Sequence, residues 1–111
     1  MGDPLDFEHG FFTDAGGNDI KKHIWSYKKQ REVVRRMPSY RGEMAQCHPP
    51  FAPGSKAACV ELTDGPLPDD APEIEYSVED DAVLEEWLRA NVGTTWHALG
   101  KQLLDTILTP S

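Results

Sequence analysis

The positions of proline limit where this chain can form long helices. Seven of its nine prolines lie between residues 38 and 72, and proline lacks the backbone donor that a helix interior requires. We therefore expect one helix over residues 18–37, a second over residues 77–92, and irregular structure between them. Residues 59–62 and 73–76 are predicted to be short strands, the second because its side chains alternate between polar and apolar. The predicted fold class is α+β, with two main helices, short strands and long loops.

The first predicted helix carries its apolar side chains on one face. Asn18 or Asp19 is expected to cap its start, and Pro38 to end it. The apolar face holds, at helical spacing, Ile20, His23, Ile24, Tyr27, Val34 and Met37. The opposite face is predicted to be solvated and holds Lys21, Lys28, Lys29, Glu32, Arg35 and Arg36. Arg31 falls within the apolar arc, so we expect its guanidinium group to meet a carboxylate or a carbonyl.

The second predicted helix has clear signals at both ends. Ser77 and Asp80 stand at the spacing of a near capping box, and Gly93 provides the stop. Glu85 and Arg89 are four residues apart and are expected to pair on the solvated face. The buried stripe is predicted to hold Val83, Leu84, Trp87 and Leu88. This helix therefore fixes where the residues after Gly93 emerge.

Charge is distributed unevenly along the chain. Eight of the eleven basic residues lie between Lys21 and Arg41, whereas residues 57–88 hold eleven acidic residues and no Lys or Arg. We expect the basic helix to pair with the acidic half of the same chain, the alternative being that it contacts an acidic partner. The net charge of −8 argues against nucleic acid or an anionic membrane as the main partner.

At 111 residues the chain forms one domain at most. It has no run of about 18 apolar residues that would span a membrane. Its first residues lack the basic and apolar regions of a signal peptide, so we expect an intracellular chain in which Cys47 and Cys59 are free thiols. No metal site is expected, because Cys47-His48 has no second ligand pair, and the acidic clusters Asp69-Asp70 and Glu79-Asp80-Asp81 lack the alternating ligands of a calcium loop.

Residues 93–100 read Gly-Thr-Thr-Trp-His-Ala-Leu-Gly and form the stretch with the strongest chemical character. Thr, Trp and His are neither turn formers nor strong helix formers, so local structure gives little reason for this run. A positioned imidazole at His97 beside the flat ring of Trp96 suits general acid/base chemistry on a planar cofactor or substrate. The alternative is a short buried strand in which His97 is a hydrogen-bonded core residue.

The run from Thr94 to Gly100 resembles the signature of the glucose–methanol–choline oxidoreductases. Other stretches are similar to the same family, closest to its fungal short-chain alcohol (methanol) oxidases. These stretches are residues 3–12, residues 25–29, Arg31-Glu32, Arg35-Arg36-Met37 and Glu79-Asp80-Asp81. On this resemblance, residues 1–100 are a partial C-terminal substrate domain, and residues 101–111 are a divergent tail outside the family pattern.

The resemblance implies an FAD-dependent alcohol oxidase, in which a small primary alcohol gives hydride to the flavin and oxygen is the acceptor. It assigns His97 as the catalytic base that accepts the hydroxyl proton and Trp96 as an aromatic wall of the substrate pocket, with both side chains next to the flavin. The family's second catalytic His or Asn would follow Ser111, and the sequence has no Gly-x-Gly-x-x-Gly unit to hold the flavin diphosphate. The chain alone is therefore expected to be inactive. Two alternatives are a partner that docks on a separate flavin domain and a non-enzymatic interaction module.

The tail departs from the family pattern directly after Gly100. The family continues with Thr-Cys-Lys-Met, whereas residues 101–111 read Lys-Gln-Leu-Leu-Asp-Thr-Ile-Leu-Thr-Pro-Ser. One hypothesis is that an unspliced intron or a frame change produced this tail. The alternative is a short amphipathic helix with Leu103, Leu104, Ile107 and Leu108 on one side. Methanol-type relatives are peroxisomal, but the final Thr-Pro-Ser is not a peroxisomal address.

Overall fold

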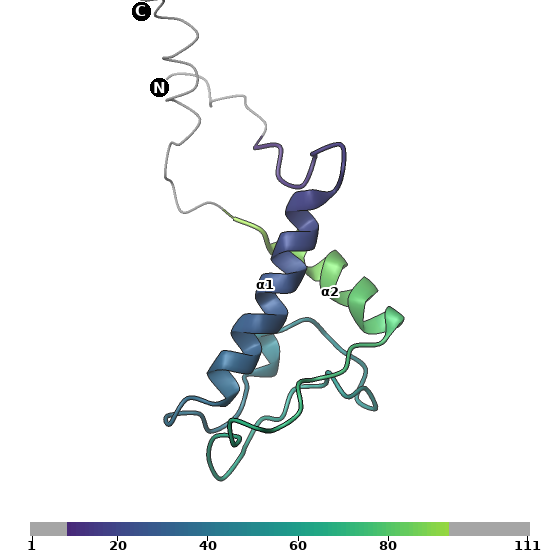
Figure 1. The fold of residues 1–111 in the computed structure, drawn as a ribbon. Coiled ribbons are helices and arrows are strands. Elements are labelled where there is room, and N and C mark those ends of the chain that lie inside the picture. Colours follow the sequence, from purple (N-terminus) through teal and green to yellow (C-terminus); the bar gives the residue numbers. More distant parts are fainter. Residues whose placement is uncertain (1–8, 94–111) are drawn as a thin grey trace, which may run out of the picture.

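Two helices and a long irregular segment make up the part of the chain that the structure, a computed structural model, describes, residues 9–93. Helix α1 spans Asn18–Arg35, the short 3-10 helix η1 spans Ala45–Cys47, and helix α2 spans Val78–Asn91. Helix α2 packs against α1, and the irregular segment between them loops around the C-terminal end of α1 and returns to the start of α2 (Figure 1). In residues 9–93 neither helix is long and apolar enough to cross a membrane.

Helix α1 begins one residue after a left-handed glycine. Gly17 is the N-cap residue, with a φ of 62°. The Asp14 carboxylate accepts a hydrogen bond of 2.6 Å from the backbone N–H of Asn18. The expectation that Asn18 or Asp19 caps the helix is therefore wrong, because the turn before the helix already supplies an acceptor for the first free donor.

Helix α2 begins as its sequence predicts. The Ser77 side chain accepts a hydrogen bond from the Asp80 backbone N–H at 3.0 Å, and the Asp80 carboxylate accepts one from the Ser77 N–H at 2.9 Å, which completes the capping box. The hydroxyl of Ser55 donates to Asp80 at 2.7 Å, so the same carboxylate holds the central loop against the start of the helix. The predicted pair of Glu85 and Arg89 is also present, at 2.9 Å.

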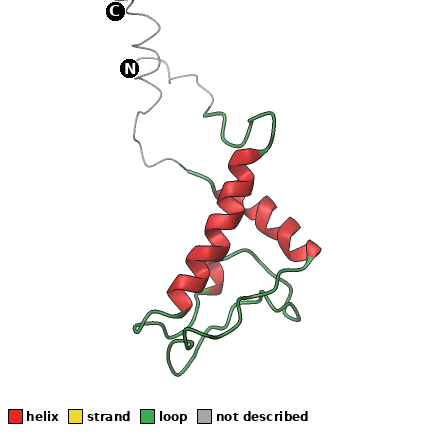
Figure 2. Ribbon diagram, viewed as in Figure 1, coloured by secondary structure: helices red, strands yellow, loops and turns green. Residues whose placement is uncertain are grey.

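The predicted α+β class is wrong for the described residues, which contain no strand (Figure 2). Arg41–Glu43 does lie beside Val60–Thr63, through hydrogen bonds from Glu43 N to Val60 O (2.8 Å) and from Thr63 N to Arg41 O (2.9 Å). These two bonds are out of register by one residue. Gly42 therefore lies opposite both Glu61 and Leu62, as in a β-bulge, and no regular ladder follows.

Gly42 is required at this close approach. Its φ is 130°, and a Cβ atom there would lie 2.2 Å from the carbonyl oxygen of Glu61. Only a residue without a side chain fits this position.

The second predicted strand, residues 73–76, is irregular, and its backbone bonds to a helix side chain. The backbone N–H of Ile74 donates to the Glu32 carboxylate of α1 at 2.8 Å. Earlier in the returning chain, Leu67 N donates to the carbonyl of Arg35 at the end of α1, at 2.9 Å. Helix α1 thus supplies the acceptors that a neighbouring strand would otherwise supply, and the described part of the chain is all-α.

The interior is small and partly charged. The buried apolar side chains within residues 9–93 are Ile20, Tyr40, Pro49, Ala57 and Leu84, and the buried charged ones are Arg31, Glu32, Glu43 and Asp80. Glu32 was expected on the solvated face, but it accepts hydrogen bonds from the side chains of Arg35 (3.0 Å) and Arg36 (2.6 Å) as well as from Ile74. Toward the end of α1 the predicted apolar face is open to solvent instead, with Val34 41% and Met37 46% exposed.

Candidate functional site

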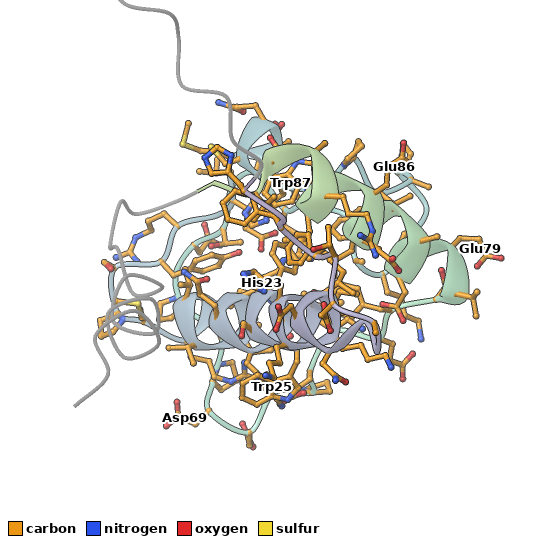
Figure 3. The ribbon with its side chains drawn as sticks, turned by 90° about the horizontal axis from the view of Figure 1, so that it is seen from above. His23, Trp25, Asp69, Glu79, Glu86 and Trp87 are labelled. Atoms are coloured by element: carbon orange, nitrogen blue, oxygen red, sulfur yellow. The ribbon has the colours of Figure 1, made fainter. Side chains whose placement is uncertain are left out.

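The two residues that the sequence assigns to catalysis, Trp96 and His97, lie outside the described residues. What the structure does give is the surroundings of the helix that leads to them. The last two turns of α2 carry Trp87 and Leu88, and Figure 3 shows Trp87 and His23 on the side where the two helices face one another. Trp25 lies on the opposite side of α1.

A groove with a volume of about 550 Å³ lies between α1, the loop that follows it and the end of α2. This volume falls within the range of small-molecule and side-chain binding sites. The side chains and backbone that line the groove are His23, Ser26, Tyr27, Gln30, Arg31, Val34, Gly42, Glu43, Met44, Cys47, His48, Trp87 and Leu88.

A tyrosine–histidine pair forms the polar part of the groove. The hydroxyl of Tyr27 on α1 is 2.7 Å from Nδ1 of His48 in the loop after η1. The Tyr27 ring also lies 6.2 Å from the ring of Trp87 and 6.5 Å from that of Phe51, centroid to centroid. The Tyr27 ring thus has two aromatic neighbours besides His48.

Burial keeps both members of this pair neutral. It raises the pKa of the Tyr27 hydroxyl well above its ordinary value of 10.0, against the opposing effect of Arg31. Burial also lowers the pKa of His48 below its ordinary 6.5, with Glu43 acting to raise it and Arg31 to lower it. At neutral pH the phenol and the imidazole are therefore both uncharged, and the tautomer of His48 sets which of the two donates the hydrogen bond.

A buried ion pair between Arg31 and Glu43 lines the same groove. The Arg31 guanidinium donates to both oxygens of Glu43, at 2.5 and 2.8 Å, and to the carbonyl of Ala57 at 2.8 Å. Burial alone would lower the pKa of Arg31, but its hydrogen bonds with Glu43 and Tyr76 outweigh burial and raise it. The expectation that Arg31 meets a carboxylate or a carbonyl is confirmed, since it meets both.

The basic helix and the acidic half of the chain also pair as expected. Lys28 Nζ is 2.6 Å from Asp81 in α2, and Lys29 Nζ is 2.9 Å from Glu73. Much of the positive charge of α1 is therefore engaged within the chain, which weakens the alternative of an acidic partner. In residues 9–93 no three His, Cys, Asp or Glu side chains are grouped so as to hold a metal ion. Cys47 and Cys59 are free thiols.

Sequence reasoning missed the Tyr27–His48 pair. It placed Tyr27 on the apolar face of α1 and treated Cys47-His48 only as a rejected metal motif. The two residues are 21 positions apart, with no local pattern that joins them. Trp87 and Leu88, predicted to be buried, are half-buried because they face the groove.

The neutral His48 predicts a specific pH dependence of stability. Because the folded-state pKa of His48 lies below 6.5, the unfolded chain binds more protons in the window between the two values. Stability is therefore complete above about pH 6.5 and falls as the pH is lowered through this window. Urea unfolding midpoints measured from about pH 8 to about pH 5 should show this fall, before the carboxylates with lowered pKa values, Glu43 and Glu32, begin to protonate.

The matched comparison replaces His48, which follows η1, and His23, which lies on α1, one at a time. His48→Gln should flatten the dependence between about pH 7 and pH 5, whereas His23→Gln, at an exposed position, should retain it. Equal pH dependence in the two variants would contradict the assignment.

No protein-family model matches the chain. Individual relatives do. Alcohol oxidase 1 of Komagataella phaffii is 32% identical over 132 aligned positions, covering 86% of this chain and 20% of the relative. Alcohol oxidase of Pichia angusta is 31% identical, covering 88% of this chain and 20% of the relative, and alcohol oxidase of Candida boidinii is 28% identical, covering 86% and 20%.

The chain thus spans about a fifth of the length of the relatives that it matches. The 132 aligned positions outnumber the 111 residues of the chain, so the relatives have additional residues within the matched region. The similarity covers most of the chain and recurs in three yeast species. The chain is therefore homologous to one segment of the fungal alcohol oxidases.

Proposed function

We propose that this chain forms part of the substrate side of an FAD-dependent alcohol oxidase, and that it does not oxidise alcohol alone. The observation that carries the proposal is the similarity to yeast alcohol oxidases across 86% of the chain. The substrate class is a small primary alcohol. Residues 1–100 correspond to part of the substrate domain, and residues 101–111 are a divergent tail.

In this proposal His97 is the catalytic base and Trp96 is an aromatic wall of the substrate pocket, both next to the flavin. His97 accepts the proton of the alcohol hydroxyl, a role suited to an imidazole whose pKa lies near the working pH. FAD, when bound, accepts the hydride from the carbon that carries this hydroxyl. Trp96 limits the room beside that carbon and so favours a short alcohol.

The described residues support the proposal through the placement of α2. The capping box at Ser77 fixes one end of this helix, and Lys28–Asp81 ties it to α1 at 2.6 Å. The helix ends at Asn91, six residues before His97 in the sequence. A helix anchored at both its start and its side is a suitable support for a base that must be held in one position.

The first test uses the chain by itself. Purified chain, FAD and methanol should give no flavin bleaching under anaerobic conditions and no peroxide in air. Turnover by the chain alone would contradict the proposed inactivity. If activity appeared only after a separate flavin domain was added, the chain would act as a partner in trans.

The second test places the site in a working enzyme. Residues 9–100 replace the matched segment of Komagataella phaffii alcohol oxidase 1, and flavin absorbance reports whether the chimera binds FAD. His97→Gln should slow flavin reduction by methanol about 100-fold or more, as expected for loss of a general base. The matched control, His9→Gln, at a histidine outside the groove lining, should leave the rate unchanged. A flavin-loaded His97→Gln chimera that reduces at the parental rate, or a chimera that binds no FAD, would contradict the proposal.

A further inference from the structure

The groove between α1 and α2 is open, and its rim is apolar. Val34 is 41% exposed and Met44 is 62% exposed on one side, and half-buried Trp87 and Leu88 form the other side. Exposed apolar surface that is gathered around a concave site usually marks a place where another segment packs.

The chemistry of the groove favours an uncharged apolar occupant. Arg31 and Glu43 neutralise each other at hydrogen-bond distance, so neither has charge to offer an ionic ligand. The Tyr27 hydroxyl and the His48 imidazole already bond to one another. Apart from the exposed polar side chains of His23, Ser26 and Gln30, what remains open is apolar and aromatic surface, which is stabilised by side chains such as Leu and Ile.

The end of α2 places the rest of the chain next to this groove. Val92 N donates to the carbonyl of Leu88, a groove residue, so the chain leaves α2 one turn beyond the groove wall. Residues 94–100 then precede the tail. Extended, seven residues reach up to about 23 Å, enough to return a following segment across the groove.

The tail has the sequence of a helix with one apolar face. At 100° per residue, Leu103, Leu104, Ile107 and Leu108 fall within one arc of the helix, and the five polar residues from Lys101 to Thr109 fall on the other side. Gly100 precedes this stretch and Pro110 follows it. Nine residues form a helix about 14 Å long, which is too short to be stable in water without a surface to pack on.

We propose that residues 101–109 dock as a short helix in the groove between α1 and α2, with Leu104 and Leu108 as the main anchors against Trp87 and Met44. The tail lacks a surface to pack on, and the apolar surface of the groove lacks a segment that covers it. Because the two belong to one chain, the docking has an effective concentration of about millimolar or more. This inference does not depend on alcohol chemistry, so it and the proposed function can fail separately.

Cys47 provides a natural reporter for the test, because its thiol is exposed and lines the groove. In a Cys59→Ser background, the rate of Cys47 modification by a bulky disulfide reagent measures access to the groove. Leu104→Gln with Leu108→Gln should raise this rate about tenfold, because the tail no longer covers the thiol. The matched control, Gln102→Ala with Thr106→Ala on the polar face, should keep the parental rate.

Two further measurements distinguish the chain's own tail from a second copy of the chain as the occupant of the groove. Adding a synthetic peptide of residues 100–111 to the Leu104→Gln/Leu108→Gln chain should restore slow modification. The parental rate should not change with protein concentration, as expected for docking within one chain. An unchanged rate in the double variant would overturn the proposal. A parental rate that falls as concentration rises would also overturn it, and would identify a second copy as the occupant.

Discussion

Replacing Glu43 with glutamine is expected to lower the free energy of unfolding by about 3–5 kcal/mol, because it leaves the Arg31 guanidinium buried without a counter-charge. The side chains of Arg31 and Glu43 are only 3% and 5% exposed, and both oxygens of Glu43 accept from Arg31. Water therefore cannot replace the lost partner at low cost. Urea unfolding followed by circular dichroism near pH 7 measures the loss.

The paired variant separates the charge effect from simple loss of packing. Arg31→Met combined with Glu43→Leu removes both charges together, so it should be less destabilised than Glu43→Gln alone, although it changes more atoms. If Glu43→Gln does not fold while the double variant does, that result also shows that the unpaired charge causes the loss of stability. Losses that simply add, residue by residue, would show that the two groups do not act as a pair.

Gly42→Ala is the second change with a large expected effect, about 2–4 kcal/mol of lost stability. The new methyl group would overlap the carbonyl oxygen of Glu61, which is backbone and cannot rotate away, and a φ of 130° is unfavourable for alanine. The neighbouring loop must move for the residue to fit. We therefore also expect loss of the hydrogen bond from Glu43 N to Val60 O.

Gly54→Ala is the matched control, since no atom lies within 4 Å of a Cβ placed there. It should change the free energy of unfolding by less than about 0.5 kcal/mol. Urea unfolding of both variants, with hydrogen exchange at Glu43, makes the comparison. Equal stability in the two variants would contradict the close approach at Gly42.

Features encoded within a few residues could be predicted from the sequence. The capping box depends on two residues three positions apart, Ser77 and Asp80. The ion pair depends on two residues four positions apart, Glu85 and Arg89. Both predictions are confirmed. Arg31 was also predictable, because a charged residue on an apolar helix face must find a partner. Which carboxylate it would find was not, since Glu43 lies beyond the end of the helix.

Features that depend on distant segments could not be predicted. Glu32 is buried because its carboxylate accepts a hydrogen bond from the backbone of Ile74, 42 positions away. A helical wheel shows only the spacing of residues within the helix, so it cannot reveal this contact. The expected strand at residues 59–62 fails for a similar reason: its partner includes Gly42, and the resulting bulge interrupts the ladder. The Tyr27–His48 pair joins a helix to a loop through tertiary packing alone.

Helix α1 and its C-cap residue Arg36 hold the returning chain on both sides of Asp69 and Asp70. Leu67 N donates to the Arg35 carbonyl before them, and Arg36 donates to the Ala71 carbonyl after them, at 2.6 Å. The stretch between these attachments, residues 68–70, includes exposed Asp69 and Asp70 and bears little of the interior. Because the entropy of closing a loop grows only slowly with its length, residues can be added there without disturbing either helix. Evolution can therefore lengthen or shorten this edge of the domain while the helix pair keeps its shape.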